Sequence, residues 1–288
     1  MEKFYGIYPA LITPFNEQGK INEKALQQLV KLNLDKGVSG FYVGGSTGES
    51  FLLSVEERKA ILEIVSHEAR GKAKIIAHIG SIATDHAIEL ARHAADLKVD
   101  AVSSVPPFYY KFSLAEIKSY YLDIVNDVNL PMIIYNIPAL SGVTFTSQNI
   151  SDLLTDSRVI GVKWTSYDLF QMQRMLSENP NLTIFNGHDE VFLGSLAMGA
   201  KAAIGSTFNF MAEKFIHIQN LYEAQKLEEA RILQDEVNQI INVLIRIGVF
   251  QGVKAGLEMM GIPCGDCRKP FRKLNLEEIK LLQQVLNL

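Results

Sequence analysis

Eight short apolar runs recur along the chain, and each is followed by a stretch with helical periodicity. The runs are continuous rather than alternating, which is typical of parallel strands that helices cover on both faces. Their centres lie about 20 to 36 residues apart, the length of one strand–helix unit. The predicted strands are residues 6–12, 40–43, 74–79, 101–105, 132–135, 159–163, 183–185 and 202–205.

This alternation implies either a closed barrel or an open, doubly wound sheet. Because there are eight units and no Gly-x-Gly-x-x-Gly motif follows the first run, the pattern favours an α/β fold of the (β/α)8 TIM-barrel type. Helix-start signals separate the runs, including two Ser-x-x-Glu capping boxes. The predicted helix starts are Asn22, Ser54, Thr84, Ser113, Thr146 and Asp168.

After the eighth run the chain becomes entirely helical. We therefore expect a barrel over residues 1–210 and a C-terminal helical extension of the same domain over residues 211–288. A length of 288 residues is compatible with two domains at about 150 residues each. No Gly/Ser-rich linker or change of composition marks a boundary, however, so one domain is the better interpretation.

Composition excludes several classes of protein. Lys and Arg number 28 against 32 Asp and Glu, so no basic excess exists for binding nucleic acid. The longest uncharged stretch, residues 128–150, contains two prolines and many polar residues, which argues against a membrane span. Pro9 and Pro14 interrupt the N-terminal region before a signal-type apolar segment forms, so a cytoplasmic location is expected.

Two candidate catalytic residues end neighbouring strands. Lys163 closes an apolar run, and burial there would disfavour the charged form of an amine. A neutral amine can attack a carbonyl and form a Schiff base, although a lysine here could equally extend to solvent at the barrel mouth. Tyr135 ends the preceding strand, where it could relay a proton or simply be a half-buried aromatic.

Two loops carry candidate binding residues. In the glycine-rich loop 44–49, backbone N–H groups with Ser46 and Thr47 could hold a carboxylate, or the loop could be a plain tight turn. It lacks the Gly-Lys-Ser/Thr of a phosphate-binding loop. After the seventh run, Asp189 and Glu190 could bind polyol hydroxyls or act as helix N-terminal carboxylates.

No metal site is expected. The six histidines show no metal-binding spacing. Cys264 and Cys267 form a Cys-x-x-Cys pair that lacks two further ligands, and their role stays open.

Three motifs occur together in the order and spacing of one family. They are Gly-Gly-Ser-Thr-Gly-Glu at 44–49, Tyr-Asn-Ile-Pro at 135–138 and Gly-Val-Lys-Trp-Thr at 161–165. Over essentially its whole length the chain resembles the pyruvate-dependent class I aldolases, the dihydrodipicolinate synthase / N-acetylneuraminate lyase family. Residues 135–142, 186–190 and 205–207 resemble the lyase branch in particular. Leu140 stands where the synthase branch usually has an arginine for a second carboxylate.

The resemblance implies a lyase that cleaves N-acetylneuraminate, a sialic acid, to N-acetylmannosamine and pyruvate. Lys163 would form an imine with the keto carbon, and Tyr135 would relay the proton of the C4 hydroxyl. Ser46 and Thr47 would hold the substrate carboxylate, and no metal or organic cofactor would be needed. The residues implied for the sugar portion are Thr165, Gly187, Asp189, Glu190 and Ser206.

The resemblance also bears on assembly. Tyr109 matches a family tyrosine that reaches a neighbouring subunit's site, although packing at the barrel rim is the alternative. The match implies at least a dimer, and the resemblance to the family implies a homotetramer. Phe250 matches a position near the substrate but could equally belong to the core.

Other functions remain open at this stage. The chain could be another aldolase of the family, acting on a 2-keto-3-deoxy sugar acid or as a dihydrodipicolinate synthase. It could be a noncatalytic sugar-acid binding protein on the same barrel. A metal-dependent aldolase is disfavoured by the histidine pattern.

Overall fold

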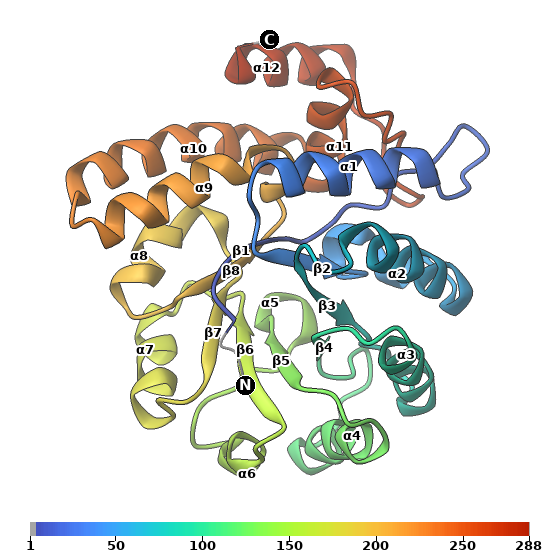
Figure 1. Ribbon diagram of the computed structural model, residues 1–288, viewed down its shortest axis with the longest axis vertical. Coiled ribbons are helices and arrows are strands. Elements are labelled where there is room, and N and C mark those ends of the chain that lie inside the picture. The colour runs from blue at the N-terminus through green and yellow to red at the C-terminus, as the bar shows by residue number, and fades with distance from the viewer. Residues whose placement is uncertain (1–3, 288) are drawn as a thin grey trace.

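The computed structural model describes residues 4–287. Its eight strands form one parallel sheet in the order β1-β8-β7-β6-β5-β4-β3-β2. The Leu11 N–H donates to the Tyr42 carbonyl (3.0 Å) beside a parallel bridge between Ala10 and Tyr42, and this contact closes the sheet into a barrel. The strands are β1 (Gly6–Pro9), β2 (Gly40–Val43), β3 (Lys74–His78), β4 (Ala101–Ser104), β5 (Met132–Asn136), β6 (Val159–Trp164), β7 (Thr183–Asn186) and β8 (Ala202–Gly205). The predicted (β/α)8 barrel is confirmed (Figure 1).

Helices surround the barrel and then continue beyond it (Figure 1). The helices between and after the strands are α1 (Glu23–Asp35), α2 (Val55–Ala69), α3 (Thr84–Asp96), α4 (Leu114–Asp127), α5 (Pro138–Ser141), α6 (Ser151–Thr155), α7 (Leu169–Glu178), α8 (Phe192–Ala197) and α9 (Phe208–Glu223). The 3-10 turns η1 (Ser46–Gly48), η2 (Ser50–Leu52) and η3 (Asp189–Val191) lie in the loops after β2 and β7. The extension adds α10 (Leu227–Ile247), α11 (Val249–Met259) and α12 (Leu276–Leu286).

Five of the six predicted helix starts are confirmed. Ser54 and Ser113 form reciprocal capping boxes, the Asn22 and Asp168 side chains cap α1 and α7, and α3 begins at Thr84.

The prediction at Thr146 is wrong. The Thr146 N–H donates to Asn149 Oδ1 (2.8 Å), and the Asn149 N–H donates to Thr146 Oγ1 (3.2 Å). These reciprocal bonds build a turn, and α6 begins only at Ser151. Short polar side chains that bond nearby backbone groups favour turns as readily as helix caps.

The strand β5 shows why the apolar runs are continuous. Its Ile133 and Tyr135 belong to the cluster inside the barrel, whereas Met132 and Ile134 pack in the cluster beneath the helices. Successive side chains of a strand point to opposite faces, and here both faces are covered. The barrel interior is therefore filled by side chains, and the functional site must form where the strands end.

The C-terminal extension packs on one side of the barrel, where α9, α10, α11 and α12 gather beside α1 (Figure 1). Phe215, Val237, Leu257 and Leu282 from these helices belong to the same apolar cluster as Leu26 of α1. The division of the chain near residue 210 stays a prediction. Within residues 4–287 no single helix is long and apolar enough to cross a membrane. The helices α10 and α11 reach that length and composition only together, and the chain bends by 118° between them.

Candidate active site

Lys163 and Tyr135 lie side by side at the carboxyl ends of β6 and β5, where they are register partners. The lysine is 4% exposed. Its Nζ lies 3.9 Å from the Tyr135 ring centroid and 4.3 Å from that of Tyr42. Among the described residues it forms no ion pair or hydrogen bond, so nothing but two aromatic faces holds the amine. An amine in this position is accessible to a carbonyl compound entering from the barrel mouth.

Sequence reasoning missed Tyr42. It comes from β2, well away from β6 around the barrel, and no pattern in an apolar run distinguishes it. Its hydroxyl donates to Ser103 Oγ (3.1 Å), and burial raises its pKa well above the usual value. Tyr42 therefore stays a neutral phenol whose ring face contacts the lysine.

His78 is a second buried aromatic neighbour of Tyr135, with ring centroids 6.1 Å apart. Burial lowers the pKa of His78 well below its usual value, so the ring is neutral. Its Nδ1 lies 2.8 Å from the Gly44 carbonyl oxygen and donates to it. The histidine thereby ties the start of the glycine-rich loop to the barrel interior.

The glycine-rich loop is held against the end of β8. Thr47 Oγ1 and Ser206 Oγ lie 2.7 Å apart, which joins the loop after β2 to the loop after β8. Thr13 Oγ1 donates to the Gly48 carbonyl (2.7 Å). A Cβ on Gly48 would lie 2.9 Å from the Leu11 carbonyl oxygen, so only glycine fits this close approach. The turn is thus fixed with Ser46 and Thr47 beside the lysine.

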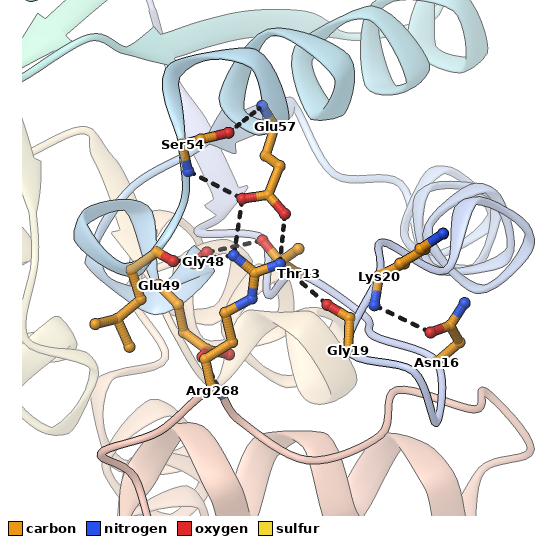
Figure 2. Close-up of polar contacts among 10 residues, drawn as sticks. Thr13, Asn16, Gly19, Lys20, Gly48, Glu49, Ser54, Glu57 and Arg268 are labelled. Carbon is orange, nitrogen blue, oxygen red and sulfur yellow. Dashed lines mark hydrogen bonds and ion pairs between the residues drawn. The ribbon is translucent and has the colours of Figure 1, made fainter.

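A segment of the C-terminal extension around Arg268 contacts the end of this loop at Glu49 (Figure 2). Glu49 has a left-handed backbone (φ 60°), and its carboxylate accepts the Arg268 N–H (2.7 Å). Glu49 Oε1 also forms an ion pair with Lys254 Nζ (2.7 Å), in which the side chains are 0% and 2% exposed. The Arg268 guanidinium donates to the Leu52 carbonyl (2.9 Å) and to Glu57 Oε2 (2.8 Å). The extension therefore fixes the loop that carries Ser46.

Two of the buried polar atoms that lack partners among residues 4–287 belong to residues lining the same cavity as Lys163, namely Thr165 Oγ1 and Asp189 Oδ1. The other Asp189 oxygen accepts the Thr207 N–H (2.9 Å) and Oγ1–H (2.7 Å). A Cβ on Gly187 would lie 1.9 Å from Thr165 Oγ1, so this glycine leaves the hydroxyl its space. Buried polar atoms are normally satisfied, and both of these line a cavity, so a ligand's hydroxyls can complete them.

Burial raises the pKa of Asp189 to about 6, although two hydrogen bonds from Thr207 favour its charged form. Because the folded-state pKa lies above the unfolded value, this group's contribution to stability is fully present below about pH 4. It is lost as the pH rises through about 6, with a size of about 3 kcal/mol. The free energy of unfolding of the wild type should therefore fall relative to Asp189→Asn between pH 4 and 7. A difference that stays constant in urea titrations across that range would contradict this.

Glu190 follows Asp189 in the loop after β7 and lines the same cavity. Burial raises its pKa, but hydrogen bonds from His188 and Tyr167 outweigh burial and bring the pKa to about 2. Glu190 is therefore a carboxylate at neutral pH and can accept hydrogen bonds from hydroxyl groups.

One cavity of about 560 Å³ collects every catalytic and substrate-binding residue that the sequence suggested. These are Ser46, Thr47, Tyr135, Lys163, Thr165, Gly187, Asp189, Glu190 and Ser206. Phe250 and Leu140 line it as well. Tyr109 does not, because it lies on the loop after β4 with 84% of its surface exposed.

The remaining candidates concern metals and thiols. Within residues 4–287 no group of three or more His, Cys, Asp or Glu side chains could hold a metal ion. Burial raises the pKa of both Cys264 and Cys267 to about 12, so the two thiols stay protonated and are poor nucleophiles.

A buried amine beside a tyrosine, at the carboxyl end of a (β/α)8 barrel and in one cavity with a glycine-rich loop, is the arrangement expected of a class I aldolase. The chain belongs to the dihydrodipicolinate synthetase family, whose model matches residues 3–288.

Known relatives are similar over their full length. An N-acetylneuraminate lyase of Rhizobium meliloti (strain 1021) is 42% identical over 284 residues, covering 99% of this chain and 95% of that protein. CdNal from Clostridium difficile, solved in complex with mannosamine, is 40% identical with a TM-score of 0.96, covering 99% of both chains. The N-acetylneuraminate lyase of Fusobacterium nucleatum, solved with pyruvate, is 38% identical with a TM-score of 0.93, covering 98% of this chain and 96% of that one.

Proposed function

We propose that this protein is a Schiff-base aldolase that cleaves N-acetylneuraminate to N-acetylmannosamine and pyruvate in sialic acid catabolism. The observation that carries the proposal is the amine of Lys163, which has no hydrogen-bond or ion-pair partner among residues 4–287 and lines one cavity with Asp189 and Glu190. The relatives support the substrate, since lyases of this name share 42–43% of their residues with this chain.

The reaction begins when Lys163 Nζ attacks the C2 keto carbon of the open-chain sugar acid and water leaves. The resulting protonated imine withdraws electrons from the C3–C4 bond. Tyr135 relays the proton from the C4 hydroxyl, together with the substrate carboxylate, as that bond breaks and the aldehyde N-acetylmannosamine departs. The enamine left on Lys163 takes a proton at C3, and water hydrolyses the imine to release pyruvate and the free amine.

Two groups of cavity-lining residues orient the substrate. Ser46, Thr47 and the backbone N–H groups of their loop hold the carboxylate, beside Ser206. The sugar portion meets Thr165, Gly187, Asp189 and Glu190. Two of these supply buried atoms that lack partners among residues 4–287.

Leu140 lines the same cavity in the place where the synthase branch usually has an arginine. An apolar side chain cannot pair with a second carboxylate, so a dicarboxylic product is disfavoured. This favours the lyase reaction over dihydrodipicolinate synthesis.

Pyruvate release from N-acetylneuraminate tests the proposal directly. We expect release with this substrate, less with a six-carbon 2-keto-3-deoxy sugar acid, and no condensation of pyruvate with aspartate semialdehyde. Activity should survive a chelator. No pyruvate from N-acetylneuraminate would refute the substrate, and no borohydride-stable adduct with pyruvate would refute the chemistry and favour a noncatalytic binding protein.

We also propose a cytoplasmic homotetramer in which Tyr109 completes a neighbouring subunit's site. Tyr109 is held in a left-handed conformation (φ 77°), and its ring packs edge-on against Tyr110 (5.1 Å), so two exposed aromatic rings project together. Exposed aromatic patches of this kind mark interfaces. The presence of just two cysteines agrees with a reducing compartment. Sedimentation of the protein at assay concentration tests the assembly, and a monomer would contradict it.

A further inference from the structure

Two aromatic side chains stack at the mouth of the cavity. Tyr167 follows β6 and His188 follows β7, and their ring centroids lie 4.2 Å apart with planes only 6° from parallel. Both residues line the same cavity as Lys163. Although Tyr167 is 62% exposed, the stack gives its ring a fixed position and joins two neighbouring loops.

Both residues contact one oxygen of Glu190. The Tyr167 hydroxyl donates to Glu190 Oε1 (2.6 Å), and His188 Nδ1 lies 3.4 Å from the same atom. No side chain among residues 4–287 donates to Glu190 Oε2. Tyr167 and His188 therefore occupy Glu190 Oε1, and Glu190 Oε2 stays available as a hydrogen-bond acceptor.

The main chain beneath Glu190 is also fixed. Asn238 Nδ2 of α10 donates to the Glu190 carbonyl (3.0 Å), and Gln234 Nε2 donates to the Asp189 carbonyl (3.2 Å). Glu190 Oε2 and Asp189 Oδ1, which has no partner among residues 4–287, are therefore two acceptors carried by consecutive residues whose main chain is held in place. Successive hydroxyls of a polyol chain are matched donors for such a pair.

We propose that the stacked Tyr167–His188 pair determines tail-length specificity: it fixes Glu190 Oε2 as the acceptor for the terminal hydroxyls of a long polyol tail. Tyr167 and His188 are positioning residues, since they act through Glu190 rather than on the reacting atoms. The enzyme then discriminates in favour of nine-carbon 2-keto sugar acids over shorter ones that end before reaching Glu190. This inference rests on the proposed lyase function.

The variant Tyr167→Phe tests it, because phenylalanine keeps the ring stack and removes only the hydroxyl. We expect kcat/KM for N-acetylneuraminate to fall about tenfold, mostly through a higher KM, because Glu190 loses one charge-assisted hydrogen bond. Cleavage of a six-carbon 2-keto-3-deoxy sugar acid, and borohydride trapping of pyruvate, should stay unchanged. Tyr5→Phe, an exposed tyrosine at the opposite end of the barrel, is the matched control and should alter neither.

The outcomes separate this inference from the proposed function. Equal losses on both substrates, or no loss on either, would overturn the role of the pair. A wild type that cleaves the short and long substrates equally well would also overturn it while leaving the Schiff-base chemistry intact. A wild type that traps pyruvate but cleaves neither substrate would refute the proposed function, and the inference would fall with it.

Discussion

Lys163→Ala is expected to abolish the borohydride-stable adduct with pyruvate and to lower kcat by about 10³-fold or more. Lys163 is the sole lysine that lines the described cavity, so no second amine can take over imine formation. The measurement is the mass of the chain after reduction with borohydride, combined with steady-state pyruvate release. Binding of substrate should be less affected than turnover, because the carboxylate loop and the acidic end of the cavity remain.

Two controls sharpen this experiment. Lys163→Arg keeps a positive charge but replaces the amine by a guanidinium that does not deprotonate, so it should be as inactive as alanine. Lys31→Ala removes an exposed lysine on α1 and should leave the adduct intact. Adduct formation in Lys163→Ala, mapped to another lysine, would contradict the assignment.

Lys254→Met is expected to lower the free energy of unfolding by about 3 to 5 kcal/mol, because it leaves the Glu49 carboxylate buried without its counter-charge. Neither Glu49 nor Lys254 lines the Lys163 cavity, but their ion pair holds the αL backbone at the end of the Ser46–Thr47 turn. A non-glycine residue in that conformation costs about 1 to 3 kcal/mol and persists only where its surroundings hold it. We therefore also expect the pyruvate concentration needed for half-maximal borohydride trapping to rise.

The double variant Glu49→Gln/Lys254→Met separates charge from packing. Removing both charges should restore much of the lost stability, since a buried pair is more costly to break than to replace. Urea unfolding of the single and double variants measures the coupling. A loss below about 1 kcal/mol in Lys254→Met would show that water or another group compensates Glu49.

Much of the active site was predictable because its residues end consecutive strands. Tyr135 and Lys163 are neighbours for the simple reason that β5 and β6 are neighbours, and the carboxyl ends of parallel strands meet at one edge. The motif order then predicted which residues would line the cavity. The prediction failed at Thr146, because the same short polar side chains can either cap a helix or build a turn. The sequence carries no signal that distinguishes these two local structures.

Other contacts arise from closure of the barrel. Tyr42 contacts Lys163 across the barrel interior. Thr47 contacts Ser206 because only β1 separates β2 from β8 in the closed ring, so the loops that follow β2 and β8 lie close together. Glu49 meets Lys254 only after the extension folds back over the loop. The residues of such pairs are far apart in the sequence, so no local spacing pattern predicts their contact.

The sequence by itself determined the strand–helix alternation, the barrel and the position of Lys163 at a strand end, because hydrophobic periodicity and capping act over a few residues. Only the tertiary structure decided what surrounds that lysine, how the loop of Ser46 and Thr47 is fixed, and which oxygen of Glu190 accepts the Tyr167 hydroxyl. Those features depend on side chains that meet across the barrel or between its loops, where the distance in sequence bears no relation to the distance in space.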